Sequence, residues 1–124
     1  MTKLEIIAET AAYYSNPSNR GKKPEGGCFY LTKDGKMCAF GRCMIDPSYL
    51  AGYGGLEDGE FLGANKGVTK HFTQELLKPE YRGHNSSFWS ALQNWHDDDS
   101  NFTETEISNI GILSLESLRT RHAD

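Results

Sequence analysis

The residues best suited to chemistry are one cysteine, Cys38, and a histidine followed by an aspartate, His96 and Asp97. A thiol is activated by an adjacent base such as an imidazole that a carboxylate orients. Cys38 falls at the end of a predicted strand, where backbone N–H groups of the following turn can lower the pKa of a thiol. These residues are candidates for a thiol-dependent catalytic site. The sequence does not show that Cys38 meets His96 or either of two other histidines, His71 and His84.

A zinc site would use all three cysteines, Cys28, Cys38 and Cys43, with a histidine as the fourth ligand. Structural zinc sites usually separate paired cysteines by about two to four residues. Here nine residues separate the first pair and four separate the second. Cysteine is also often buried for simple packing, and an odd number of thiols favours the reduced state. We therefore predict no metal and no cofactor, with these cysteines as the only metal candidates. A glycine-rich phosphate-binding motif is absent as well.

The charge is unevenly distributed along the chain. The net charge is −4, yet residues 20–43 hold six basic side chains against two acidic ones, a balance of +4 that leaves −8 for the remainder. A nucleic-acid-binding protein needs a dominant basic face, so nucleic acid is a disfavoured partner. Tyrosines beside basic residues are typical of protein interfaces. The predicted partner-binding residues are Arg20, Lys22, Lys23, Lys33, Lys36, Arg42, Tyr49 and Tyr53.

A β-hairpin over residues 28–41 is predicted to position the cysteines. Asp34 and Gly35 lie between two runs of aromatic and apolar residues, the strongest short hairpin signal. A two-residue turn would place Cys28 and Cys38 on opposite faces of the hairpin, whereas a three-residue loop would place them diagonally on one face. The second register is slightly favoured, and both stay open.

Other segments flank this hairpin. A capping box and helical spacing predict a helix over residues 3–14, with Leu4, Ile7, Ala8, Ala11 and Ala12 in its apolar pattern. Residues 16–27 have the composition of a loop. Residues 42–45 are predicted as a short helical turn. Residues 51–67 contain six glycines and are predicted as a long loop.

Three further helices are predicted in the C-terminal half. The first covers residues 67–77. The second is capped by Asn85 or Ser86 and carries a core stripe of Phe88, Leu92 and Trp95, with the acidic run at residues 97–99 as a turn after it. The last opens with a capping box at Thr103 and Glu106 and ends near residue 120. Its predicted buried residues are Ile107, Ile110, Leu113 or Ser114, and Leu118.

These elements predict one α+β domain over residues 1–124, with an N-terminal helix, a β-hairpin and two or three C-terminal helices packed around it. A composition of 37% hydrophobic and 24% charged residues is typical of a globular chain. No apolar run approaches the roughly 18 residues that span a bilayer, and the N-terminus lacks the pattern of a signal peptide. We predict a protein of the cytoplasm that does not contact membranes.

Two stretches resemble small uncharacterised proteins common in phages and prophages. Residues 28–41 match their C-x-Y…DG-x-x-C-A-x-G signature, and residues 92–97 match a downstream L-Q-x-x-H-D segment. The resemblance covers residues 3–118 and implies an origin in a mobile genome, a helix–hairpin–helices domain and no settled activity. It draws attention to Cys28, Cys38, His96 and Asp97, as a site or as a buried polar clamp that joins hairpin to helix. The clamp is favoured, because buried polar groups must be satisfied.

The function predicted from these features is that of a small phage-type accessory protein. It would bind a host or viral protein and modulate or inhibit a host protein or defence system. The alternative is a thiol-dependent enzyme or a zinc-stabilised module that uses Cys38 and His96. The sequence does not decide whether the chain is an enzyme, although the balance favours a binding role, and it leaves a homo-oligomer open.

Overall fold

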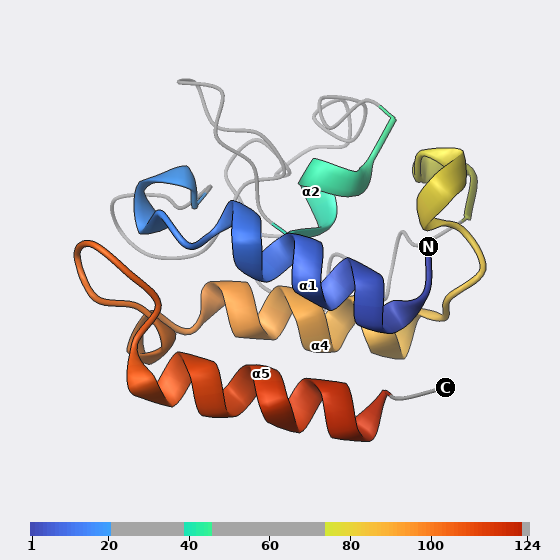
Figure 1. The fold of residues 1–124 in the computed structure, drawn as a ribbon. Helices are drawn as coiled ribbons and strands as arrows, with labels where there is room; N and C mark the ends of the chain where they lie inside the picture. Colours follow the sequence, from blue (N-terminus) through green and yellow to red (C-terminus); the bar gives the residue numbers. More distant parts are fainter. Residues whose placement is uncertain (21–38, 46–73, 123–124) are drawn as a thin grey trace.

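The described part of the chain is helical. The structure is a computed structural model that describes residues 1–20, 39–45 and 74–122 (Figure 1). No strand is present in these ranges, and isolated bridges pair Met44 with Leu77 and Phe102 with Ile107. The predicted α+β fold class is therefore wrong for this part. Its α-helices are α1 (Lys3–Tyr13), α2 (Ala39–Cys43), α4 (Ser86–Asp97) and α5 (Asn109–Arg121).

The end of the predicted β-hairpin is helical. Helix α2 starts at Ala39, where the second strand of the hairpin was expected. It also includes Arg42 and Cys43, which were predicted to begin a separate helical turn over residues 42–45. Ala39 and Cys43 are four residues apart and both are fully buried, which a helix achieves because residues i and i+4 share one face. Packing of this segment against α4 therefore outweighs its strand propensity. Strand propensity is easily outweighed in this way, because it depends strongly on the surrounding structure. Residues 28–38 lie outside the described residues, so neither hairpin register is tested.

Helix α1 confirms the predicted capping box. The Glu5 amide donates to Thr2 Oγ1 at 3.1 Å, and the Thr2 amide donates to Glu5 Oε1 at 2.8 Å. These bonds satisfy two backbone donors that the first turn of a helix leaves unpaired. The fully buried face is formed by Ile6, Ile7 and Thr10, so it agrees with the predicted one at Ile7 alone. The side chain of Leu4 is 40% exposed.

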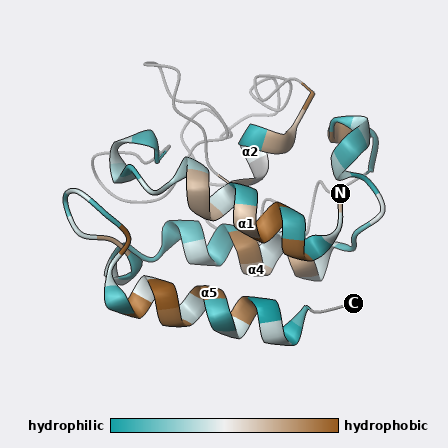
Figure 2. Ribbon diagram, viewed as in Figure 1, coloured by the Kyte–Doolittle hydropathy of each residue, from teal (hydrophilic) through white to brown (hydrophobic). Residues whose placement is uncertain are grey.

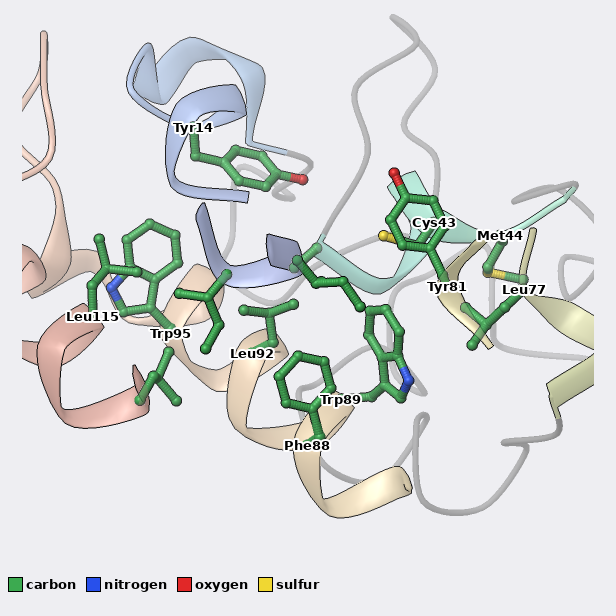
Figure 3. Packing of buried hydrophobic residues seen from close by; sticks show 14 residues of the cluster. Tyr14, Cys43, Met44, Leu77, Tyr81, Phe88, Trp89, Leu92, Trp95 and Leu115 are labelled. Atoms are coloured by element: carbon green, nitrogen blue, oxygen red, sulfur yellow. The ribbon is translucent and has the colours of Figure 1, made fainter. Parts of the chain in front are cut away.

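Helix α4 forms the centre of the core. Its N-terminus is capped as predicted, because Asn85 Oδ1 accepts a hydrogen bond from the Phe88 amide at 3.1 Å. The predicted stripe is confirmed, with Phe88, Leu92 and Trp95 no more than 3% exposed. Figure 3 shows Trp95 of this stripe beside Leu115 of α5, and Tyr14 of the N-terminal segment belongs to the same buried cluster. Residues far apart in the sequence therefore share one core.

Helix α5 begins later than predicted, and its buried face agrees with the predicted one only in part. Its N-cap is Ser108, whose Oγ accepts from the Gly111 amide at 3.0 Å. The predicted cap, Thr103, accepts from the Glu106 amide at 3.0 Å, but within a turn that precedes the helix. The buried residues of α5 are Gly111, Leu115 and Leu118. Of the predicted core positions, Leu118 is confirmed as buried, whereas Ile110 and Leu113 are exposed.

Short turns complete the described structure. They are the 3-10 helices η1 (Pro17–Asn19), η4 (Gln74–Leu76), η5 (Pro79–Tyr81) and η6 (Asp99–Asn101). The end of the helix predicted over residues 67–77 is therefore a 3-10 turn followed by a bridge residue, and residues 67–73 lie outside the described residues. Helix α5 packs on α1 and α4, and the three run alongside one another in Figure 1. None of the described helices is long and apolar enough to cross a membrane.

Candidate functional site

Arg20 ties the N-terminal segment to the end of α4. Its Nε and Nη2 donate to the backbone carbonyl of His96 at 3.0 and 2.5 Å, and its Nη1 lies 3.1 Å from Asp99 Oδ1. The guanidinium also stacks over the ring of Phe102. The last carbonyls of a helix lack partners and carry partial negative charge, so a cation there is stabilising. Arg20 thereby offsets the acidic run at this helix end.

His96 and Asp97 are brought together as neighbours in the packed interior. His96 is fully buried and its Nδ1 lies 2.9 Å from Asp97 Oδ1. The same carboxylate oxygen accepts from Gln93 Nε2 at 2.8 Å, and the imidazole meets the ring of Tyr14 edge-on. This arrangement holds the imidazole between α1 and α4. The predicted clamp between hairpin and helix is not tested, because Cys28 and Cys38 lie outside the described residues.

Arg42 forms a second joint, between α1, α2 and η5. Its Nη1 lies 2.6 Å from Glu9 Oε1, and its Nη2 donates to Thr10 Oγ1 at 3.1 Å. Tyr81 donates its hydroxyl to Glu9 and accepts from Arg42 Nη1 at 3.3 Å. The side chain of Arg42 is 10% exposed and that of Glu9 is 38% exposed. The pair is therefore partly shielded from water.

The acids in this joint are tuned by their contacts. Burial opposes ionisation of Glu9, but hydrogen bonds from Tyr81 and Arg42 outweigh it and hold the pKa of the Glu9 carboxyl below its ordinary value. Burial and the hydrogen bond to Glu9 together raise the pKa of the Tyr81 hydroxyl to about 12. At neutral pH the joint thus contains a carboxylate, a guanidinium and a neutral phenol, a complementary set that stabilises the fold.

Cys43 is the one cysteine in the described ranges, and its thiol is not activated. It is fully buried, and burial raises the pKa of the Cys43 thiol to about 12. A nucleophilic cysteine needs the opposite, an accessible thiol with a lowered pKa. Among the described residues, no three histidine, cysteine or acidic side chains gather in a way that could hold a metal ion. Cys43 accordingly serves the core.

Thiol labelling tests this assignment of Cys43. In a chain whose Cys28 and Cys38 are replaced with serine, Cys43 should react with an aromatic disulfide at pH 8 about a thousandfold more slowly than in the same chain unfolded in urea. The raised pKa and the burial both lower the concentration of attackable thiolate. Stopped-flow absorbance measures the rate. Rapid labelling of the folded chain would show that Cys43 is accessible and reactive, contrary to this assignment.

The residues predicted to bind a partner fall into two groups. Arg20 and Arg42 are described, and both guanidinium groups are engaged within the chain by the joints above. The remaining members lie outside the described residues: Lys22, Lys23, Lys33, Lys36, Tyr49 and Tyr53. Within the described residues, these two arginines therefore stabilise the fold by pairing with acidic groups of the same chain.

A surface that the sequence did not predict lies on α5. Ile110, Ile112 and Leu113 are 57%, 47% and 66% exposed, and we call these three residues the α5 outer face. Leu113 lies about 160° around the helix axis from the buried Gly111 and Leu115. Figure 2 shows that the first half of α5 is its more hydrophobic half. The signal was present in the sequence, since apolar residues there exceed what one helix face can bury.

A groove runs beside this face, between α4 and α5. Its volume is about 230 Å³, too small for most drug-sized ligands, which occupy roughly 300 to 1,000 Å³. Trp95 and Leu118 are its most buried apolar lining residues, and the whole lining is Ala91, Asn94, Trp95, Asp98, Asn101, Ser114, Leu118 and Arg121. Ser114 follows Ile110 by four residues, so the groove adjoins the α5 outer face. Together they form the candidate functional site.

Comparison with known proteins adds no family to this geometry, because no protein-family model, no curated protein and no solved structure matches the chain.

Proposed function

We propose that this chain is a small phage-type accessory protein that binds a host or viral protein and modulates or inhibits it in the host cytoplasm. The exposure of Ile110, Ile112 and Leu113 on one helix carries the proposal. Single apolar side chains are common on protein surfaces, but Ile110 and Leu113 are three residues apart, so these two exposed side chains are neighbours and form an apolar patch on the helix. Ile112 lies about 100° around the helix axis from Leu113 and extends the exposed apolar surface on that side. Other molecules often cover exposed apolar patches that lie opposite a buried face, so this patch supports a binding function.

The shape of this site favours a protein partner. Binding energy in protein interfaces concentrates in a few side chains that fill desolvated pockets. The groove between α4 and α5 offers such a recess for one side chain of the partner, with Trp95 and Leu118 as its apolar lining. The outer face would supply the surrounding apolar contact, and Asp98 and Arg121 would supply a charged rim.

The thiol and the imidazole among the described residues also favour a binding function over a catalytic one. The Cys43 thiol is buried with a raised pKa, and the imidazole of His96 is fully buried between helices. Both contribute to packing in their observed positions. The phage and host assignment comes from the resemblance in residues 28–41 and 92–97, and inhibition of a host protein or defence system is the role that this origin suggests.

Capture of a partner with matched variants tests the proposed function. A tagged chain should retain one host protein in a stoichiometric complex from bacterial lysate, identified by native mass spectrometry and then reconstituted from purified components. Replacing Ile110 and Leu113 with serine should weaken the reconstituted complex about a thousandfold, since central interface residues each contribute about 2 kcal/mol. Calorimetric titration measures the dissociation constant.

The control replaces two exposed apolar residues on other elements, Leu4 and Ile45, with serine. This control should bind like the natural sequence, and both variants should keep the natural melting temperature within a few degrees, because exposed substitutions change stability by about 0.5 kcal/mol or less. Equal affinity of all three chains for the partner would remove α5 as the contact surface. Failure to retain any stoichiometric partner would count against the binding function itself.

A further inference from the structure

We propose that the α5 outer face also pairs with α5 of a second copy of this chain, with the two helices antiparallel about a two-fold axis near Ile112 and Leu113. This inference rests on the proposed function, because it uses the same surface. It names the second copy as the occupant of that surface when no other partner is bound. A host protein would then bind in competition with self-association.

The charges around α5 are arranged for this pairing. Two acidic side chains, Glu104 and Glu106, precede the helix, and two basic side chains, Arg119 and Arg121, lie in its last turn; all four are exposed. One end of α5 is therefore acidic and the other basic. An antiparallel copy brings each acidic end to the partner's basic end, while a parallel copy would oppose like charges.

The apolar residues lie at the centre of this charge pattern. In sequence, Ile112 and Leu113 are midway between the acidic and basic pairs. In a two-fold interface each residue meets its counterpart across the axis, so the central position must tolerate contact with itself. Leu113, at 66% exposure, meets that requirement. Glu116 also lies on this side, three residues before Arg119, a spacing at which opposite charges on a helix attract each other.

The expected association is weak. A helix of 13 residues is about 20 Å long, and one such helix from each copy buries less than the roughly 1,000 Å² typical of a stable interface. The dissociation constant of the dimer should therefore be roughly tens of micromolar or higher. A weak dimer leaves the α5 outer face available to a tighter partner.

Sedimentation of the purified full chain tests this pairing. Between about 5 and 500 µM, the natural sequence should shift from the monomer mass of 13.9 kDa toward twice that value. Leu113→Ser should remain monomeric over the range, because it removes the central apolar contact. Leu4→Ser, which changes an exposed leucine on α1, should associate like the natural sequence.

Charge reversal tests the antiparallel orientation. One variant carries Arg119→Glu with Arg121→Glu, and the other carries Glu104→Lys with Glu106→Lys. Each variant alone should associate at least tenfold more weakly, because both ends of its dimer then oppose like charges. Their equimolar mixture should associate again, because every acidic end then faces a basic one. Raising the ionic strength should weaken this rescue by screening.

Three results would overturn the inference: a natural sequence that stays monomeric throughout, a dimer that survives Leu113→Ser, or charge variants that do not rescue each other. The proposed function fails separately. A dimer that forms as expected while no host protein binds would refute the partner but leave the pairing. If a host protein is captured but the purified chain stays monomeric, the pairing is refuted and the proposed function is supported.

Discussion

Replacing Arg42 with alanine should lower the free energy of unfolding by about 2 kcal/mol, a value between those for exposed and fully buried ion pairs. The guanidinium contacts Glu9, Thr10 and Tyr81 at once. Its loss therefore leaves several polar groups without their partner in a joint that connects α1, α2 and η5. Urea denaturation monitored by circular dichroism measures the change. Arg119→Ala, which removes an exposed arginine, should change the same quantity by about 0.5 kcal/mol or less.

The same joint predicts a pH dependence. The pKa of the Glu9 carboxyl is lower in the folded chain than its ordinary value, so ionised Glu9 stabilises the fold above its unfolded pKa. That contribution is lost as the pH falls through the folded pKa. Glu9→Gln should therefore be less stable than the natural sequence at pH 7, and the difference should shrink toward zero in acid. A difference that stays constant from pH 7 to about pH 3 would show that the charge of Glu9 does not matter.

Local sequence signals predicted the ends and the core of some helices. The start of α1 follows from Thr2 and Glu5 because both partners of a capping box lie within one turn. The cap at Asn85 and the buried stripe of α4 follow from spacing in the same way. In these cases the residues that determine the structure are close together in the chain.

The remaining features depend on residues that are far apart in the chain. The contact of Arg20 with the end of α4 joins positions 76 residues apart, so local sequence signals could not predict that this arginine holds two segments together. Strand propensity at residues 39–41 was overridden because the helical turn buries Ala39 and Cys43 against α4. His96 and Asp97 were identified as notable from sequence, but their structural role required the positions of Tyr14 and Gln93.

Replacing Gly111 with alanine should lower the free energy of unfolding by about 3 kcal/mol, the upper end of the range for overpacking a core. A Cβ at this position would lie 2.1 Å from the backbone oxygen of Asn101 and 2.7 Å from Cγ2 of Ile107. The first neighbour is backbone, so α5 and η6 would have to separate. Thermal and urea denaturation of the full chain measure the loss.

The sign of this change is decisive, because alanine inside a helix is ordinarily about 1 kcal/mol more favourable than glycine. Ser117→Ala, an exposed position on the same helix, is the matched control and should be neutral or slightly stabilising. A stabilised Gly111→Ala would mean that α5 does not approach Asn101 so closely. That approach fixes the rotation that buries Leu115 and turns Ile110 and Leu113 outward. The glycine therefore supports both the fold and the surface proposed to bind a partner.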